Sequence, residues 1–296
     1  MTDKSMVEAT VADPGGDGVA LAIEGLTKSF PTKRNLLGRA TETVDAVRGV
    51  SLEVRKGETL AVVGESGAGK STVGRLALRL IEPDSGSIRV LGDDITAMGR
   101  KDLRAVRGRA TMIFQDPFKS LDPRAPIRYS IAEPMLAQGG YSNSDRKKRV
   151  SVLMDRVGLT AHHLERYPYE MSGGQLQRVA IARALVTDPE VVVCDEPVAA
   201  LDMSIRSHVI NLLRELQEER NLAYLFISHD MSLVRVIADR IAVMRRGEVL
   251  EYGDAARVFG APESEYAQTL LAAIPAAHPR DRTFRPAPDG AGTAVE

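Results

Sequence analysis

Short apolar runs that end in glycine or polar residues recur along the chain and predict most of its strands. Leu60–Val63 is one such run, and Val191–Cys194 is β-branched and continuous, which is typical of a strand buried on both faces of a parallel sheet. The alternation of Val50–Val54 predicts instead a half-buried strand. The remaining predicted strands are Val19–Ile23, Ser87–Leu91, Ala110–Phe114, Ala223–Ile227, and the hairpin of Arg240–Met244 with Glu248–Tyr252.

Apolar residues at helical spacing predict helices between these strands. From Val73 to Leu80 they recur at i, i+3, i+4 and i+7, which indicates an amphipathic helix. A second helix is expected over Asp145–Val157, with Ser142 or Ser144 as N-cap and Gly158 as stop. Others are expected up to about Val186 and around Ile205 to Leu216. The basic segment Pro31–Thr43 has no such pattern and is expected to be a loop.

Composition narrows the class of protein. The chain has 296 residues and a formal net charge of −1, which gives no reason to expect a nucleic-acid partner. The basic cluster Arg146–Arg149 is interpreted as a solvated helix face. The one cysteine, Cys194, excludes an intramolecular disulfide and an all-cysteine metal or iron–sulfur site, fits a reducing cytosolic setting, and is expected to be a small buried hydrophobe.

The two ends of the chain lack the patterns of folded structure. No run of about 18 apolar residues is present, so no membrane span is expected. The stretch 1–18 is rich in small and acidic residues without an apolar core, which argues against a signal peptide and predicts a disordered tail. The stretch 276–296 is rich in Pro, Ala and charge and is expected to be disordered as well.

The strongest chemical signal lies between the predicted strand Leu60–Val63 and the helix after it. This strand–loop–helix context turns a match to G-x-x-x-x-G-K-[ST] into a phosphate-binding loop, in which backbone N–H groups and a helix N-terminus surround the phosphates. Lys70 is placed to reach the β- and γ-phosphates, and the Ser71 hydroxyl to bind Mg²⁺. The sequence therefore predicts an ATP-type nucleotide site formed by Gly64, Glu65, Ser66, Gly67, Ala68, Gly69, Lys70, Ser71 and Thr72.

Polar residues follow three further strands, at the sheet edge where ligands of open α/β sheets bind. Asp195 after an apolar strand matches an acidic magnesium ligand, and Glu196 is placed to polarise an attacking water. Gln115 is a candidate to orient water or touch magnesium, and His229 to contact the γ-phosphate. For each residue a structural role (solvation, helix capping, or a hydrogen-bonded core histidine) is the alternative. Phe30 is a candidate to stack on adenine or an ordinary core residue.

A second glycine-bearing segment opens the helix that runs to about Val186. Ser172, Gly173, Gly174 and Gln175 would present N–H groups and a hydroxyl to a phosphate, or would form an N-cap with a flexible turn. The adjacent His162 and His163 lack metal-ligand spacing on a helix and are interpreted as surface residues.

Taken together, these motifs resemble the ATP-binding subunits of ABC transporters over about Leu21 to Pro275. Walker A is Gly64–Ser71, the Q-loop is Gln115, the signature is Met171–Gln175, Walker B ends in Asp195-Glu196, the D-loop is Ala200–Asp202, and the switch histidine is His229. Met171 replaces the usual leucine. The resemblance implies an α/β P-loop NTPase fold with a RecA-like core, an antiparallel β subdomain and an α-helical subdomain. Its implied bounds are 19–275, with helices over about 116–187 and a C-terminal extension over about 246–275.

The resemblance also implies a mechanism and partners. Two subunits would dimerise head to tail, with ATP and Mg²⁺ between the Walker A of one chain and the signature of the other. Glu196 would be the general base, His229 would sense the γ-phosphate, and the segment after Gln115 would couple to transmembrane permease subunits. This places the chain, peripherally, on the cytoplasmic face of the cell membrane, where the second ATPase subunit is an identical chain or a paralogue.

A narrower likeness, to the oligopeptide, dipeptide and nickel importers, rests on three segments: Gln115–Arg124 with Ile131–Pro134, Cys194–Asp202, and Tyr266–Pro275. It implies uptake of peptides or a related small solute with an indirect solute-binding partner. An exporter ATPase remains open as an alternative. A soluble cassette ATPase acting on DNA or ribosomes is disfavoured by the lack of a coiled-coil insertion or second cassette, and a non-hydrolysing module by the intact Glu196 and His229.

Overall fold

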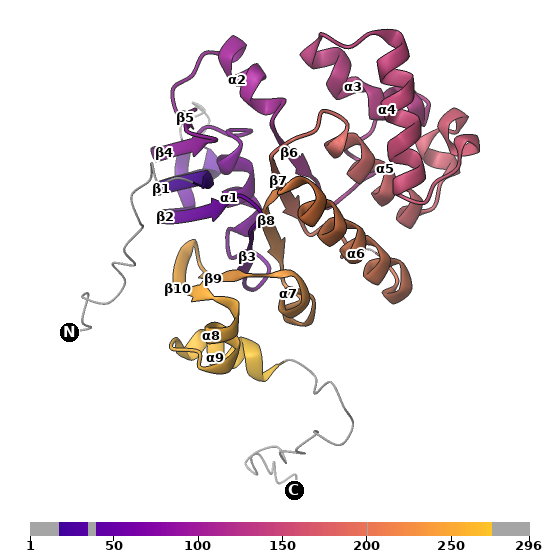
Figure 1. Ribbon diagram of the computed structural model, residues 1–296. Helices are drawn as coiled ribbons and strands as arrows, with labels where there is room; N and C mark the ends of the chain where they lie inside the picture. The colour runs from indigo at the N-terminus through magenta and orange to yellow at the C-terminus, as the bar shows by residue number, and fades with distance from the viewer. Residues whose placement is uncertain (1–17, 35–39, 200, 274–296) are drawn as a thin grey trace, which may run out of the picture.

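The computed structural model describes residues 18–34, 40–199 and 201–273. They form two sheets with helices between and around them (Figure 1). The two expected tails, apart from Gly18, and the Ala200 position of the D-loop lie outside these residues.

The first sheet is antiparallel and has the strand order β2-β1-β4-β5. β1 and β2 are long and pair along most of their length, with Phe30 opposite Val44. The expected loop at Pro31–Thr43 is therefore wrong over Pro31–Arg34 and Ala40–Thr43, which belong to these strands. Residues 31, 32, 42 and 43 are exposed, so the strand here does not need an alternation of apolar and polar residues, and the pattern is hidden. The bounds are β1 Val19–Arg34, β2 Ala40–Arg55, β4 Ser85–Val90 and β5 Asp93–Asp94.

The second sheet is the buried centre of the molecule, with the order β10-β9-β3-β8-β7-β6. Its pairs are parallel from β9 to β6, and the β9–β10 hairpin is antiparallel, as predicted. Every residue of β3, β7 and β8 is buried, which explains their unbroken apolar runs. The bounds are β3 Thr59–Val63, β6 Ala110–Ile113, β7 Val191–Asp195, β8 Ala223–Ser228, β9 Arg240–Arg245 and β10 Glu248–Asp254.

Helices flank the sheets in three groups (Figure 1). α1 contacts strands of both sheets, α3–α5 gather beyond β6, and α8 and α9 lie beside the β9–β10 hairpin. The bounds are α1 Lys70–Ala77, α2 Arg100–Arg107, α3 Ile127–Gln138, α4 Asn143–Arg156, α5 Gly173–Leu185, α6 Met203–Arg220, α7 Met231–Ile237, α8 Ala255–Gly260 and α9 Glu265–Ala272, with 3-10 turns at Ala161–Glu165 and Pro168–Glu170.

The observed helix ends match the predicted capping residues more closely than they match the ends expected from the spacing of apolar residues. Ser142 caps α4 in a reciprocal pair with Asp145, as one of the two predicted caps. α1 stops at Ala77 and Arg79 takes a positive φ of 48°, so the expected continuation to Leu80 is wrong and Leu80 is exposed. The sequence analysis does not predict α2, α7, α8 or α9, each of which has eight residues or fewer and so presents only about two turns of an apolar pattern.

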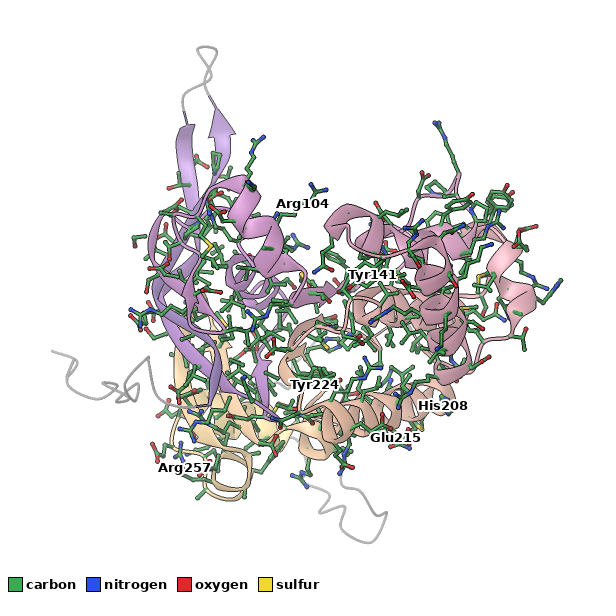
Figure 2. The ribbon with its side chains drawn as sticks, turned by 45° about the horizontal axis from the view of Figure 1, so that its top comes forward. Arg104, Tyr141, His208, Glu215, Tyr224 and Arg257 are labelled. Atoms are coloured by element: carbon green, nitrogen blue, oxygen red, sulfur yellow. The ribbon has the colours of Figure 1, made fainter. Side chains whose placement is uncertain are left out.

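Close packing fixes the position of α1 against the central sheet. A Cβ at Gly74 would lie 2.6 Å from Ile227 Cδ1 and 3.0 Å from Val193 Cγ1, so a larger residue would require these side chains to shift. On the other side of the sheet Tyr224, labelled in Figure 2, is fully buried and donates a hydrogen bond to the Leu213 carbonyl of α6 at 3.0 Å. The sheet is thus held between α1 and α6, and its strand ends are fixed.

None of the helices in the described part of the chain has the length and apolar character that a membrane span requires.

Candidate functional site

The predicted site residues converge because their strands are neighbours. β3, β8, β7 and β6 are adjacent and parallel, and their register places Val63 opposite Ser228 and Asp195 opposite Ile227. The phosphate loop follows β3, His229 follows β8, Glu196 follows β7 and Gln115 follows β6. Parallel strands bring their carboxyl ends to one edge, so these four segments meet there.

The phosphate loop depends on glycine at two positions. Gly64 and Gly69 have φ of 151° and 101°, and a Cβ on either would lie 2.1 Å from a backbone carbonyl oxygen, that of Met244 or of Ala46. Gly69 is also the N-cap of α1, where a left-handed conformation turns the loop into the helix. The loop is therefore pressed between the end of β9 and strand β2.

Lys70 and Ser71 lie where the phosphates of a nucleotide would be held. Lys70 is buried, and its Nζ donates to the carbonyls of Gly64 and Glu65, each at 2.8 Å. Burial lowers the pKa of Lys70, against the attraction of Glu196, Asp195 and Glu65. Its ammonium can exchange these neutral carbonyls for charged phosphate oxygens, which form stronger hydrogen bonds.

The Ser71 hydroxyl donates to Asp195 Oδ1 at 2.7 Å. Asp195 is 1% exposed, and burial raises the pKa of its carboxyl. A hydroxyl and a carboxylate in contact at a helix N-terminus fit Mg²⁺, which prefers oxygen ligands and keeps several waters and phosphate oxygens of its own. No group of three or more His, Cys, Asp or Glu that could hold a metal occurs in the described ranges.

Glu196 is held between the two other candidates. Gln115 Nε2 donates to its Oε2 at 2.8 Å, and His229 Nδ1 lies 3.0 Å from its Oε1. Glu196 has a φ of 47°, and its N–H donates to the Ile227 carbonyl at 3.0 Å. A non-glycine residue in this conformation is strained and persists where its surroundings enforce it, which is common in active sites. This conformation turns the Glu196 side chain toward Gln115 and His229.

Phe30 lies on the neighbouring β hairpin. It pairs with Val44, and both side chains are exposed, at 39% and 55%. The alternative prediction that Phe30 is an ordinary core residue is therefore wrong. Ala46, two residues along β2 from Val44, is the residue whose carbonyl abuts Gly69. The exposed ring of Phe30 therefore lies close to the phosphate loop, about two strand positions away from the Ala46 carbonyl that contacts it. Lys28 Nζ lies 5.8 Å from the centroid of this ring.

The signature segment forms an N-cap in this chain. Ser172 Oγ accepts from the Gln175 N–H at 3.3 Å, and Gln175 Oε1 accepts from the Ser172 N–H at 3.0 Å. Ser172 and Gly173 are exposed, and a Cβ on Gly173 would meet nothing within 4 Å, whereas one on Gly174 would lie 2.9 Å from Ile205 Cδ1. Within the part of the chain that the structure describes, no hydrogen bond joins this segment to the phosphate loop.

Two neighbours of the site have no motif that identifies them from sequence. Gly247 in the β9–β10 turn donates its N–H to the Ala68 carbonyl at 2.9 Å. His163, interpreted as a surface residue, is half-buried with its Nε2 3.3 Å from Gln175 Nε2. A third, Tyr266, is described below.

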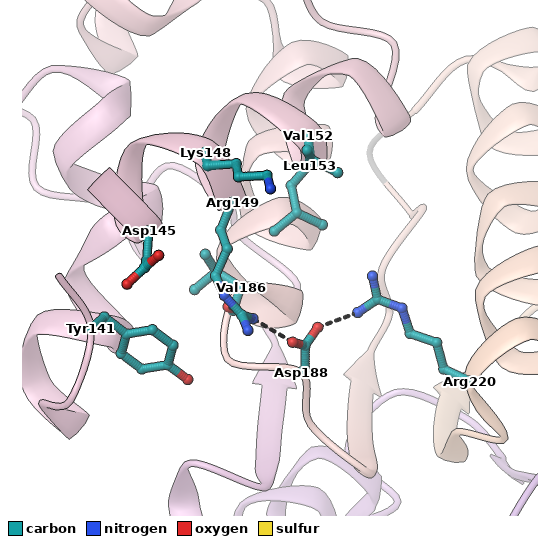
Figure 3. A pocket seen from close by; sticks show the side chains of 9 residues that line it. All are labelled: Tyr141, Asp145, Lys148, Arg149, Val152, Leu153, Val186, Asp188 and Arg220. Carbon is teal, nitrogen blue, oxygen red and sulfur yellow. Dashed lines mark hydrogen bonds and ion pairs between the residues drawn. The ribbon is translucent and has the colours of Figure 1, made fainter. Parts of the chain in front are cut away.

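A pocket of about 470 Å³ lies elsewhere, between α4, the end of α5 and α6 (Figure 3). The Asp188 carboxylate lies between two arginines that line this pocket. It accepts hydrogen bonds from Arg149 and from Arg220 Nη1, the latter at 2.6 Å. None of the residues that line it belongs to the predicted site. Its ion pairs instead tie helix α4 to the core through the loop after α5.

Comparison with known proteins agrees with this site. The family model described as ABC transporter matches residues 47–199, just over half of the chain. The chain belongs to the ABC transporter family. The phosphate loop of this cassette is accordingly an ATP-binding loop.

The curated relatives and solved structures of this cassette are also ABC proteins. It is 47% identical to the oligopeptide transport ATP-binding protein OppD of Mycobacterium tuberculosis over 276 residues, which are 93% of this chain and 45% of that protein. It is 48% identical to the glutathione import ATP-binding protein GsiA of Shigella flexneri over 272 residues, 92% of this chain and 43% of that protein. The chain thus spans about half the length of these relatives. The dimeric post-hydrolysis structure of the cassette MJ0796 with ADP and Pi has a TM-score of 0.71 at 27% identity, covering 79% of this chain and 98% of that one.

Proposed function

We propose that the chain is the ATP-hydrolysing subunit of an ABC importer that takes up oligopeptides, dipeptides or a related small solute through a membrane permease. The observation that carries the hydrolytic assignment is Glu196, whose carboxylate lies at the strand edge beside the Ser71–Asp195 pair and between Gln115 and His229. The importer assignment is supported by the relatives named for oligopeptide transport and glutathione import.

In this proposal each residue has one task. The phosphate loop binds the phosphates, Lys70 neutralises their charge, and Phe30 stacks on the adenine. Ser71, Asp195 and Gln115 hold Mg²⁺, which when bound supplies charge neutralisation at the phosphates. Glu196 releases one of its two partners and accepts the proton of the attacking water, while His229 remains to contact the γ-phosphate.

The signature is proposed to act on the nucleotide of a second subunit. Ser172 and Gly173 are exposed, and the Ser172 hydroxyl keeps its own proton free for donation because it only accepts within the cap. The N-terminus of α5 adds its N–H groups. The structural neighbour MJ0796 is a dimer with ADP and Pi, which supports this arrangement. Identifying the proteins that co-purify with this chain from detergent-solubilised membranes would show whether the second subunit is an identical chain or a paralogue.

The permease is proposed to dock near the segment after Gln115. Phe118, Tyr129 and Leu136 there are large apolar residues with 43%, 53% and 52% of their surface exposed. Tyr129 and Leu136 line the same surface pocket, and exposed apolar groups that cluster in this way mark interaction surfaces. The chain would then sit peripherally on the cytoplasmic face of the membrane, with a solute-binding protein as an indirect partner.

The test is Glu196→Gln in the full chain, assayed for phosphate release and for MgATP binding. Hydrolysis is expected to fall about 100-fold or more, the range for loss of a general base, with binding retained. The matched control is Glu190→Gln, a half-buried glutamate just before β7 that pairs with Arg109 and Lys56, at the opposite end of the strand from Glu196. This variant is expected to hydrolyse ATP normally. Normal turnover in Glu196→Gln would refute the assignment.

A further inference from the structure

The C-terminal helix α9 is anchored to the core next to the phosphate loop. The loop before it is held by the buried carboxylate of Glu251, which accepts from the N–H groups of Glu263 and Ser264, each at 3.0 Å, and from Ser264 Oγ at 2.9 Å. Ser264 in turn caps α9 by accepting from the Ala267 N–H at 3.1 Å. These contacts fix the first turn of α9, which carries Tyr266.

Tyr266 reaches from this helix to the phosphate loop. Its hydroxyl accepts a hydrogen bond from the Glu65 N–H at 3.1 Å, and its ring is 7% exposed. The guanidinium of Arg245 lies 4.7 Å from the ring centroid, at the end of β9. Tyr266 is therefore held in place by packing and stacking, independently of a nucleotide.

The peptide group that Tyr266 binds is the one that holds Lys70. The Glu65 N–H and the Gly64 C=O belong to a single planar unit, and that carbonyl accepts from Lys70 Nζ at 2.8 Å. Because the unit is planar, a bond to its N–H fixes the direction of its carbonyl, and hydrogen bonds at both ends strengthen one another. Without the Tyr266 hydroxyl, the bond from Lys70 would be the one hydrogen bond left to this unit among the described residues.

We propose that Tyr266 is a positioning residue of the ATP site, through which the C-terminal segment sets the affinity of the phosphate loop for nucleotide. The proposal rests on the proposed nucleotide-dependent function. Tyr266 touches neither phosphate nor attacking water; it acts through the Gly64–Glu65 peptide, which presents the loop and Lys70 ready to bind.

The expected effect is on binding and not on the chemical step. Groups preorganised for a ligand bind it more tightly because they need not be ordered on binding. Glu196, Gln115 and His229 are positioned by β6, β7 and β8 and have no contact with Tyr266, so turnover of bound ATP should be unaffected. A rise in KM at constant kcat is the signature of this role.

The chain contains a matched control for this tyrosine. Tyr252 also has a hydroxyl that hydrogen-bonds to backbone, here to Glu53 O at 3.2 Å, and an arginine 4.5 Å from its ring centroid, Arg240. It lies on β10, and among the described residues no hydrogen bond or ring contact joins it to the phosphate loop. Tyr252→Phe and Tyr266→Phe thus remove the same atom from similar surroundings.

The experiment measures MgADP affinity by titration, KM and kcat for ATP by phosphate release, and thermal unfolding without nucleotide, for the full-length wild type and both variants. Tyr266→Phe is expected to raise the Kd for MgADP and the KM for ATP by about 3- to 10-fold, the effect of one hydrogen bond, with kcat within about twofold of wild type. Both variants are expected to lower the thermal stability of the nucleotide-free protein to a similar extent, because each loses one tyrosine hydroxyl. Tyr252→Phe is expected to leave the Kd for MgADP unchanged.

The proposal is overturned if Tyr266→Phe binds MgADP as the wild type does, if both variants weaken binding equally, or if kcat falls while KM stays constant. Because the Kd is measured with ADP, these outcomes can be distinguished even in a preparation that hydrolyses slowly. A wild-type chain that binds no MgADP would instead refute the proposed nucleotide function.

Discussion

Replacing Asp195 by Asn should make the nucleotide-free protein more stable while it abolishes hydrolysis. The carboxylate is 1% exposed, and the described residues give it one hydrogen bond, from the neutral Ser71 hydroxyl. Burial raises the pKa of Asp195 despite the nearby Arg75 and Lys70, which means that the fold disfavours its charge. Asn keeps the acceptor for Ser71 and removes the charge.

The sign of the pH dependence follows from the raised pKa. An acid whose pKa is higher in the folded state contributes stability below its unfolded pKa, near 3.9, and loses that contribution as the pH rises through the folded value. At pH 8 the Asp195 carboxylate is charged, so the wild type is destabilised by the burial of this charge, whereas Asp195→Asn carries no charge at this position. The variant should then be more stable by about 1 kcal/mol, or roughly 2–4 °C in Tm for a domain of this size.

The assay is thermal unfolding between pH 8 and pH 4 in EDTA without nucleotide, so that no metal stabilises the carboxylate. The advantage of Asp195→Asn is expected to shrink as the pH falls through the raised pKa. Asp84 provides the opposite case: hydrogen bonds from Lys28 Nζ and the Ser29 N–H lower the pKa of its carboxyl. Asp84→Asn should therefore lower the Tm at pH 8, and the loss should persist until the pH falls below about 4.

Two results would refute this reasoning. If Asp195→Asn is less stable than the wild type at pH 8, the carboxylate stabilises the fold. If its Tm difference from the wild type is constant from pH 8 to pH 4, the raised pKa is not its cause. Phosphate release is measured in the same preparations, and hydrolysis at the wild-type rate would remove Asp195 from the proposed magnesium site.

Two further predictions concern the phosphate loop and the buried thiol. Gly69→Ala should weaken MgADP binding about 100-fold or more by titration, because its Cβ would lie 2.1 Å from Ala46 O and displace the loop by about an ångström. The control is Gly260→Ala in α8, whose Cβ would meet no atom within 4 Å, and it should bind MgADP as the wild type does. Cys194 is fully buried and burial raises the pKa of its thiol, so the native chain should not react with a maleimide at pH 7.5 within the time that the unfolded chain needs to react completely.

The sequence predicted the central sheet well because its strands obey one simple rule. β7 and β8 are buried on both faces, and burial demands unbroken apolar runs such as Val191–Cys194. Neighbouring parallel strands then bring Gln115, Glu196 and His229 to one edge, as the strand-end argument predicted. The prediction that Cys194 is a small buried hydrophobe is confirmed for the same reason.

The sequence did not predict features that depend on tertiary contacts alone. The β1–β2 hairpin extends through Pro31–Arg34 because the strands pair by backbone hydrogen bonds, which no side-chain pattern records. Contacts made by a side chain far along the chain are equally hidden: Tyr266 and Glu65 are 201 positions apart. The resemblance located Tyr266 within a subfamily segment, but only the fold places its hydroxyl on the phosphate loop.

The groups proposed for catalysis are satisfied by one another in the single chain. Lys70 is bonded to loop carbonyls, Ser71 to Asp195, and both oxygens of Glu196 to Gln115 and His229. A nucleotide must exchange these contacts, and the net gain of such an exchange is small because old and new hydrogen bonds nearly cancel. The Ser172 hydroxyl proton and the exposed Gly173 N–H have no hydrogen-bond acceptor among the described residues, so they are donors that would add to the exchange without replacing an internal bond. Under the proposed function, ATP-driven pairing of two chains, and not binding to one, would then be the step that moves Glu196 from its resting contacts toward water.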